Sequence, residues 1–437
     1  MSQPGSSNHS GYMHTIIKQI GRKGFIGELP PFCATEDFDS YLSAKTIEKR
    51  QAILKNQSRY EFSEISQNEK FGIAHIKFLR KMVDEGYNKH FRCLEEYLGF
   101  YTPPQRRILI SKNLTLNQYS PFPAYSDIEG ETLDNLRIPP HLTFIYIDRN
   151  IINPDKEPLL TMTLDMGNKE ENIIRCDCCE KGVVNCYENP NCRCYQLNKR
   201  IQEFQLKRDE PPTEFNSFSP ILFTHTNDYF WRCIGFSCSS SCSCKGHCSN
   251  NTFFMIDRKL FPFEMYRNDP LMGFLLRSPV FIPAGTPLME FTGEVMDHVR
   301  KPNVDYAYQV TIGTDTKLKE LVKEQPFTEQ YQDLLKRIMN RNFHIDPTYF
   351  GNIGRMAGHS CYPNLEVVRV YKRSLSPAHA RLIMISMTDI YPGTPLTIDY
   401  GKIYEERLSE ICRCGSFSCP QGHHEELKNL NFLNVNT

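Results

Sequence analysis

The sequence lacks any long apolar run, because nowhere do about 18 uncharged apolar residues follow one another. The segment Met1 to Ser10 is polar and has no apolar core. We therefore expect neither a membrane span nor a signal peptide, and a soluble intracellular protein. The chain also lacks an excess of either charge, since 51 Lys and Arg balance 51 Asp and Glu. This balance argues against a protein that mainly coats nucleic-acid backbone, so direct nucleic-acid binding is not indicated.

A chain of 437 residues with 40% hydrophobic content can bury two or three cores. Before about Tyr119 it has only Cys33 and Cys93, and apolar residues between Phe71 and Leu98 recur near helical spacing. The sequence therefore predicts a mostly helical amino-terminal region.

From Phe253 to Tyr400 the pattern changes to short β-rich runs separated by turn residues. The predicted strands are Val280 to Ile282, Pro287 to Phe291, Leu365 to Val370, Arg381 to Ser386 and Leu396 to Ile398. Lys317 to Met339 has instead a helical pattern. We predict an irregular, mainly β domain with some α-helix, not a doubly wound sheet.

Seventeen cysteines in an intracellular chain point to metal ligation, because a reducing compartment keeps thiols free. Two arrays contain nine of them once Cys179 and Cys233 are set aside. They are Cys176, Cys178, Cys186, Cys192, Cys194, Cys238, Cys242, Cys244 and Cys248. Three tetrahedral zinc ions need about twelve Zn–S bonds, which nine thiolates supply if six are terminal and three bridge two metals each. Whether Cys179 replaces a neighbour stays open. Lys245, Arg193 and Arg200 are possible counter-charges, although a solvated face explains them equally well.

A third cysteine group, Cys412, Cys414 and Cys419, offers only three ligands, and a structural zinc site needs four. Cys361 is the favoured fourth ligand because it lies in the polar loop GHSCYPN. The alternative is His423 or His424. With Cys361, a fourth zinc would tie the tail to the β-rich domain.

Seven segments occur in the order typical of one enzyme family. They are DIEGETLDNLRIPPHLTFIYI, CSSSCSCKGHCSNN, FIPAGTPLMEFTGEV, DYAYQV, YFGNIGRMAGHSCYPN, LTIDYG and CRCGSFSC. From Asp127 to Gly422 the chain resembles SET-domain histone-lysine methyltransferases with flanking pre-SET and post-SET zinc modules, of the Su(var)/euchromatic class that methylates lysine 9 of histone H3.

This resemblance implies a knot-like, β-rich SET domain and the following division of the chain. Residues 1–119 would be the amino-terminal helical region, 120–252 the pre-SET region with its nine-cysteine cluster, 253–402 the SET domain with a helical insertion near 317–339, 403–424 the post-SET module and 425–437 a tail.

The resemblance also implies site residues. The catalytic set would be Tyr400, Tyr306, Phe291 and Ile398, with the Tyr400 hydroxyl where the methyl group passes. S-adenosylmethionine would be bound by Met272, Gly273, Phe274, Tyr306, Gly358 and His359. Asn352, Arg355 and Asn364 would brace the fold. Transfer from a sulfonium to an amine requires alignment and a neutral lysine, which an apolar, aromatic channel favours.

Several residues depart from the family pattern, and they cluster at the cofactor and lysine sites. Leu275 replaces a glycine, Gly358 an asparagine, Phe291 a tyrosine and Ile398 an aromatic residue, while Thr348 stands where many relatives have arginine. We expect an active enzyme with weaker cofactor binding.

The family implies a nuclear, chromosomal enzyme whose substrate is the histone H3 tail or the nucleosome, with a role in gene silencing. Silencing partners would bind through the amino-terminal region. The alternatives are a weakened SET protein that acts as a chromatin scaffold, and a methyltransferase for another H3 lysine or a non-histone protein.

Overall fold

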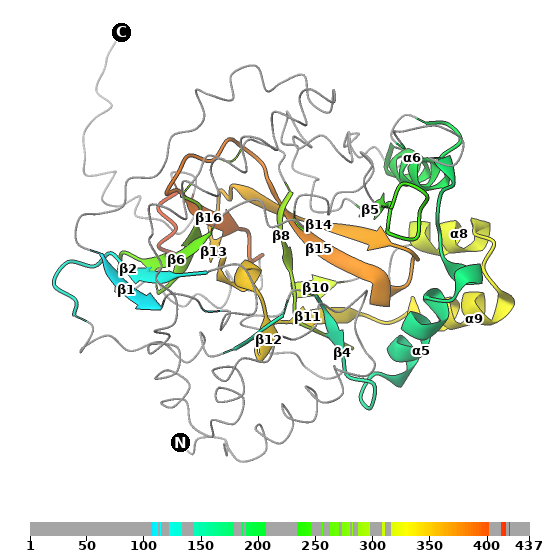
Figure 1. Ribbon diagram of the computed structural model, residues 1–437, viewed down its shortest axis with the longest axis horizontal. Coiled ribbons are helices and arrows are strands. Elements are labelled where there is room, and N and C mark those ends of the chain that lie inside the picture. The colour runs from blue at the N-terminus through cyan, green and yellow to red at the C-terminus, as the bar shows by residue number, and fades with distance from the viewer. Residues whose placement is uncertain are drawn as a thin grey trace, which may run out of the picture.

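The computed structural model describes residues 107–111, 114, 122–132, 144–147, 149–178, 186, 189–206, 234–245, 256, 263–270, 273–279, 282, 287–297, 308–310, 316–401, 412–416 and 419. The helical pattern predicted between residues 71 and 98 and the tail 425–437 lie outside these residues. Figure 1 shows strands through the middle of the described part and helices gathered at one side.

Strands dominate the described residues and form four sheets. The first has the order β1 (Ile108–Ser111), β2 (Ala124–Ser126), β6 (Glu264–Arg267), β7 (Leu275–Arg277), β16 (Pro395–Ile398) and β13 (Gly358–His359). The second has the order β5 (Ile234–Ser237), β14 (Leu365–Lys372), β15 (Ala380–Ser386) and β8 (Pro287–Phe291). The third has the order β10 (Tyr308–Val310), β11 (Phe343–Asp346), β9 (Glu294–Asp297) and β4 (Ile151–Ile152). The fourth pairs β12 (Phe350–Gly351) with β3 (Ile145–Tyr146). The predicted mainly β class is confirmed.

The helices of the described part are few and lie beside the second sheet (Figure 1). They are α5 (Pro158–Gly167), α6 (Arg193–Leu206), α8 (Thr316–Glu324) and α9 (Glu329–Ile338), with the 3-10 turns η2 (Glu170–Asn172), η6 (Ile353–Met356) and η7 (Pro377–His379). The segment predicted to be helical is thus two helices. Pro326, which has no N–H to donate, lies in the break, and the Thr328 side chain caps α9 by accepting a hydrogen bond from the Tyr331 N–H.

Strand β1 lies before the domain boundary expected at residue 119, yet it belongs to the sheet that holds β7 and β16. Buried ion pairs support this sheet, since Arg277 contacts Asp127 at 2.7 Å and Glu264 at 2.6 Å. Arg107 also reaches Glu264, at 3.1 Å. Residues on both sides of the expected boundary therefore share one buried charge network.

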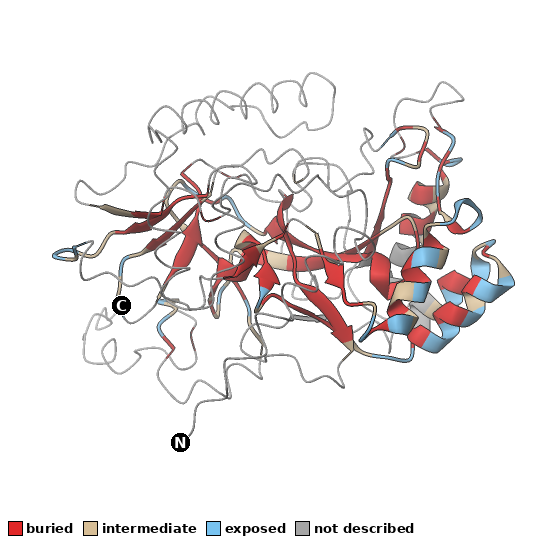
Figure 2. Ribbon diagram, turned by 60° about the horizontal axis from the view of Figure 1, so that its bottom comes forward, coloured by how far each residue is buried: buried red, intermediate tan, exposed pale blue. Residues whose placement is uncertain are grey.

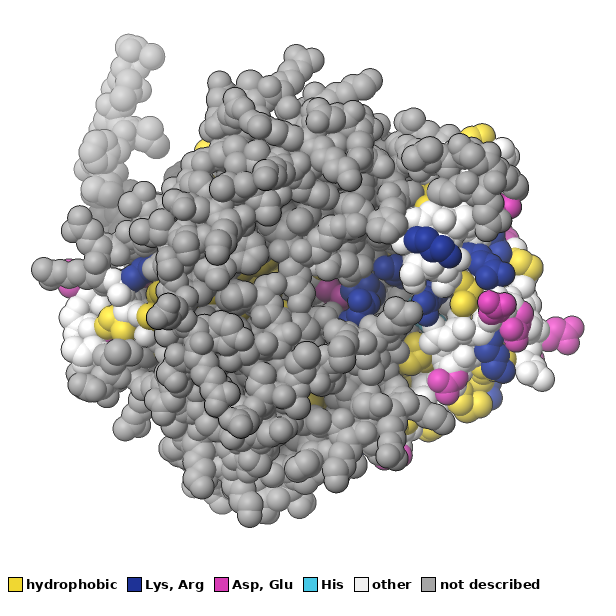
Figure 3. Space-filling view, viewed as in Figure 1, with side chains coloured by type: hydrophobic (Ala, Val, Ile, Leu, Met, Phe, Trp, Pro, Cys, Tyr) yellow, Lys and Arg dark blue, Asp and Glu magenta, His cyan; other side chains and the backbone are white. Residues whose placement is uncertain are grey.

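The core is centred on β14 and β15. All seven residues of β15 are buried, so that strand is covered on both faces, as Figure 2 shows for the central strands. Helices α5 and α9 each bury one side, and Figure 3 shows basic and acidic side chains mixed over the surface of the helical region. None of the helices in the described ranges has the length and apolar content needed to cross a membrane.

Candidate zinc centres and candidate active site

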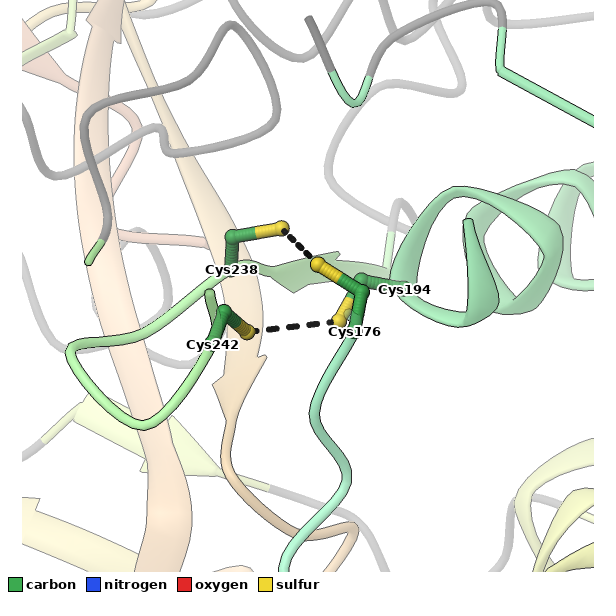
Figure 4. Close-up of side chains that lie close together, drawn as sticks. All are labelled: Cys176, Cys194, Cys238 and Cys242. Atoms are coloured by element: carbon green, nitrogen blue, oxygen red, sulfur yellow. Dashed lines mark hydrogen bonds between the residues drawn. The ribbon is translucent and has the colours of Figure 1, made fainter. Parts of the chain in front are cut away.

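Eight cysteines of the predicted nine lie together and are buried, and Cys248 is outside the described residues. Their sulfur atoms have the spacing of zinc ligands. Cys176 Sγ is 3.6 Å from Cys186 Sγ and 3.9 Å from Cys238 Sγ. Sulfur atoms arranged tetrahedrally about 2.3 Å from zinc would lie about 3.8 Å apart. Figure 4 shows the sulfur atoms of Cys176, Cys194, Cys238 and Cys242 turned toward one another.

The cysteines form three overlapping groups, each with ligand atoms within 4.8 Å of one another. The groups are Cys176, Cys194, Cys238 and Cys242, then Cys176, Cys178, Cys186 and Cys192, then Cys176, Cys186, Cys238 and Cys244. Three residues recur between groups, namely Cys176, Cys186 and Cys238. A thiolate that bridges two zinc ions belongs to the ligand groups of both. The cysteines shared between the groups therefore fit a cluster of several zinc ions.

The local structure explains why these thiols converge. Cys238 directly follows β5, which pairs with the central strand β14, and Cys194 lies in the first turn of α6. Asn198 locks the helix to the strand, because its side chain donates to the Phe236 carbonyl and accepts from the Phe236 N–H, both at 2.6 Å. Burial raises the pKa of the Cys178 thiol, so a bound cation would be needed to hold this side chain as a thiolate.

The three basic residues expected to balance the charge of the cysteine cluster have different surroundings. Arg200 forms an ion pair with Glu324 of α8 at 2.6 Å, and Arg193 donates to the Gln325 side chain at 3.2 Å. Lys245 is exposed. These contacts tie α6, beside the cysteine cluster, to the helical insertion.

A separate group of cysteines joins the segment 412–419 to the β-rich domain. Cys361, Cys412, Cys414 and Cys419 lie with their sulfur atoms within 4.8 Å of one another. Cys361 Sγ is 3.5 Å from Cys419 Sγ and 3.9 Å from Cys412 Sγ. The structure therefore brings together the four ligands predicted from the sequence. The alternatives His423 and His424 are outside the described residues.

The loop with Cys361 runs beside the segment with Tyr400. β13 pairs in parallel with β16, with His359 opposite Ile398, and the Ser360 N–H donates to the Ile398 carbonyl at 3.1 Å. The Tyr400 hydroxyl donates to the Ala357 carbonyl at 2.6 Å. Tyr400 is half-buried against the core, and Gly401 follows it with φ +81°, which favours glycine. The tyrosine is thus fixed at the meeting point of two segments distant in sequence.

Comparison with known proteins identifies this part of the chain, since residues 273–401 match the SET domain family. The chain contains a SET domain. Over 198 residues it is 30% identical to the human protein "Histone-lysine N-methyltransferase SETMAR", with 42% of this chain and 26% of that protein covered. Over 209 residues it is 27% identical to "Histone-lysine N-methyltransferase, H3 lysine-9 specific SUVH4" of Arabidopsis thaliana, with 43% and 32% covered.

The chain therefore spans less than a third of the length of SUVH4 and about a quarter of SETMAR. Among solved structures, Arabidopsis thaliana SUVH6 in complex with SAM is similar with a TM-score of 0.47 and 20% identity, covering 72% of this chain and 56% of that one. The SET domain predicted from the sequence is confirmed by the family match over residues 273–401.

The SET domain places the other predicted site residues as follows. Phe291 and Ile398 are each 4% exposed and belong to the apolar cluster on which Tyr400 packs. Gly273 has φ +74°, which favours glycine in the predicted cofactor turn, and Phe274 is buried. Met272 and Tyr306 lie outside the described residues.

Two departures from the family pattern are neighbours in space. A Cβ on Gly358 would lie 2.6 Å from Cδ2 of Leu275, and its next contact, Thr397 Cγ2, would be 3.9 Å away. The Leu275 side chain therefore occupies the space over Gly358. A side chain at position 358 would therefore have to displace the end of the Leu275 side chain.

The predicted bracing residues all bond between segments. Asn352 donates to the Glu290 carbonyl at 2.5 Å, and Arg355 donates to the Pro347 carbonyl at 2.6 Å. Asn364 donates to the Pro395 carbonyl at 2.8 Å and accepts from the Thr397 N–H at 2.9 Å.

Sequence reasoning missed two features of the site. One is the Ala357 carbonyl that accepts the Tyr400 hydroxyl, which no side-chain motif signals because it is a backbone group. The other is the His359 ring, which lies between Cys361 and the backbone of Tyr400. The motif placed His359 beside the cofactor and gave no sign of this contact.

Proposed function

We propose that the chain is an S-adenosylmethionine-dependent lysine methyltransferase that acts on lysine 9 of the histone H3 tail. The observation that carries the proposal is the Tyr400 hydroxyl, which is fixed to the Ala357 carbonyl at 2.6 Å within the SET domain. The name of the relative SUVH4, specific for H3 lysine 9, supports the choice of lysine. The proposal places the protein on chromatin in the nucleus, with gene silencing as the outcome and silencing partners bound through residues 1–119.

The cofactor supplies a methyl group on a sulfonium, and the chain has to align it with a neutral amine. Because the Tyr400 hydroxyl gives its hydrogen to Ala357, the oxygen keeps lone pairs that can accept an N–H of the substrate lysine. The buried apolar residues Phe291 and Ile398 disfavour a charged ammonium and so lower its pKa. No carboxylate base is needed in this scheme.

The metal part of the proposal is four zinc ions per chain. Three of the ions would share the bridging thiolates of Cys176, Cys186 and Cys238. Each of these ions would be bound by two bridging thiolates and by two terminal thiolates of its own. Those pairs would be Cys194 with Cys242, Cys178 with Cys192, and Cys244 with Cys248. The fourth ion would be bound by Cys361, Cys412, Cys414 and Cys419.

A tritiated-methyl assay tests the function. The full chain with zinc should label intact H3 and nucleosomes, and should not label H3 with lysine 9 replaced by alanine. Tyr400→Phe should lose most of this labelling, and Tyr391→Phe, which removes the hydroxyl of a tyrosine that is 66% exposed, is its matched control. Labelling of the lysine-9 variant would assign another lysine.

A chromatin scaffold is the second candidate, favoured by the altered residues Leu275 and Gly358 at the proposed cofactor site. Calorimetry with S-adenosylmethionine separates the two functions. No cofactor binding and no labelling of H3, together with retained binding to nucleosomes, would replace the enzyme proposal with the scaffold.

A further inference from the structure

The imidazole ring of His359 lies between the zinc site of the tail and the backbone of Tyr400. Its Nδ1 accepts a hydrogen bond from the Tyr400 N–H at 3.3 Å, and its Nε2 is 3.5 Å from Cys361 Sγ. The His359 and Tyr400 rings also pack together, with centroids 5.4 Å apart. One side chain therefore contacts both a proposed metal ligand and the proposed catalytic residue.

The two contacts determine the tautomer of the ring. A backbone N–H can only donate, so Nδ1 must be the nitrogen without a hydrogen. In a neutral imidazole the hydrogen is then on Nε2, the atom that faces Cys361. A thiolate accepts a hydrogen bond more strongly than a neutral thiol does, so an N–H directed at Cys361 Sγ would stabilise the metal-bound thiolate.

We propose that His359 is a positioning residue that links the Cys361 zinc site to Tyr400 through a single tautomer with the hydrogen on Nε2. Tyr400 is then held at two points, its backbone N–H by His359 and its hydroxyl by the Ala357 carbonyl. Zinc binding by the segment 412–419 would thereby affect the position of the Tyr400 hydroxyl through the side chain of His359.

Two substitutions separate the halves of this link. His359→Asn keeps an acceptor near the Nδ1 position and loses the donor to Cys361. His359→Gln keeps a donor that reaches toward Cys361 and loses the acceptor for Tyr400. We expect His359→Gln to lower kcat roughly three- to tenfold, with a smaller change in the KM for the cofactor and unchanged zinc content. We expect His359→Asn to lower kcat less and to release one zinc to a chelator roughly tenfold faster.

The tautomer is tested directly on the zinc-loaded wild-type chain, so the proposal does not depend on the variants folding. In protein with ¹⁵N-labelled histidine, the signal of His359 is the one among 13 histidines that disappears in His359→Asn. We expect the ¹⁵N shifts of a neutral ring with its hydrogen on Nε2. A ring protonated on Nδ1 would overturn the proposal. Equal kcat and equal zinc release in the two variants would do so too, because a merely structural role would not separate them.

The kinetic measurement rests on the proposed methyl transfer, whereas the ¹⁵N shifts and the zinc release rest only on the proposed zinc site at Cys361. If the wild-type chain transfers no methyl group, the proposed function fails while the ¹⁵N shifts and the zinc release still decide the role of His359. If methyl transfer is found and Nδ1 is protonated, the proposed function stands and the link through His359 fails.

Discussion

Leu275 and Gly358 should behave as a coupled pair, and a double-mutant cycle can measure the coupling. A Cβ at position 358 would lie 2.6 Å from Leu275 Cδ2, whereas carbon atoms in contact prefer about 3.5–4.0 Å. Leu275 is only 8% exposed and packs against Tyr125 and Tyr266, so it has little room to move. Gly358→Asn alone should therefore lower the free energy of unfolding by about 1–3 kcal/mol through overpacking.

Leu275→Ala alone should also destabilise, by about 2–3 kcal/mol, because it leaves a cavity over Gly358. In the double variant the asparagine enters that cavity, so the combined loss should be smaller than the sum by about 1–3 kcal/mol. The asparagine should also restore one hydrogen bond to the cofactor. Compared with Leu275→Ala, the double variant should bind S-adenosylmethionine about two- to twelvefold more tightly, which corresponds to about 0.5–1.5 kcal/mol.

Urea unfolding at fixed zinc concentration and calorimetry with the cofactor measure the two effects. Leu276→Ala is the matched control, since Leu276 follows Leu275 on β7 and its side chain points to the opposite face. Combined with Gly358→Asn, it should give additive losses. Additive losses in the Leu275 cycle as well would refute the reasoning, because they would show that the two side chains do not compete for one space.

Tyr400→Phe removes the oxygen at the transfer point, so kcat should fall by about 10²-fold with zinc content and cofactor binding retained. Unchanged turnover would assign Tyr400 to packing. Cys412→Ser should remove one zinc of four by elemental analysis and weaken methyl transfer, and a wild-type chain with one zinc or none would refute the metal assignment. Ile398 has no hydroxyl to hold a water near the amine, so the wild type should reach di- or trimethyl product. Ile398→Tyr should shift mass spectra of the H3 tail toward monomethyl, and only monomethyl product from both would contradict this. Burial, helped by the charge of Asp399, raises the pKa of Glu366 to about 7 from 4.5. An acid with a raised folded pKa contributes stability that is lost as pH rises, here from about 4.5 to about 7. The free energy of unfolding of Glu366→Gln should therefore exceed that of the wild type by about 1–3 kcal/mol at pH 8 and equal it at pH 4. The same pH dependence of unfolding in both proteins would exclude this role of Glu366.

The sequence by itself determined the fold class, the positions of four strands and the cysteine groups. Strands β8, β14, β15 and β16 lie where short β-rich runs predicted them. This succeeded because hydrophobic alternation and turn residues are local signals. The grouping of Cys361 with the tail cysteines followed from counting ligands against the four that zinc needs. The break in the helical insertion was readable from Pro326, although the prediction ran one helix through it.

Only the tertiary structure decided which residues touch across the chain. Leu275 and Gly358 are 83 positions apart, and neither residue type nor spacing indicates that the Leu275 side chain fills the space over Gly358. The Ala357 carbonyl is a backbone acceptor, which every residue carries, so no motif could select it for Tyr400. The motif identified His359, but its two ring contacts depend on the pairing of β13 with β16. Residue type and local pattern are written along the chain, whereas the register between distant segments results from packing the whole domain.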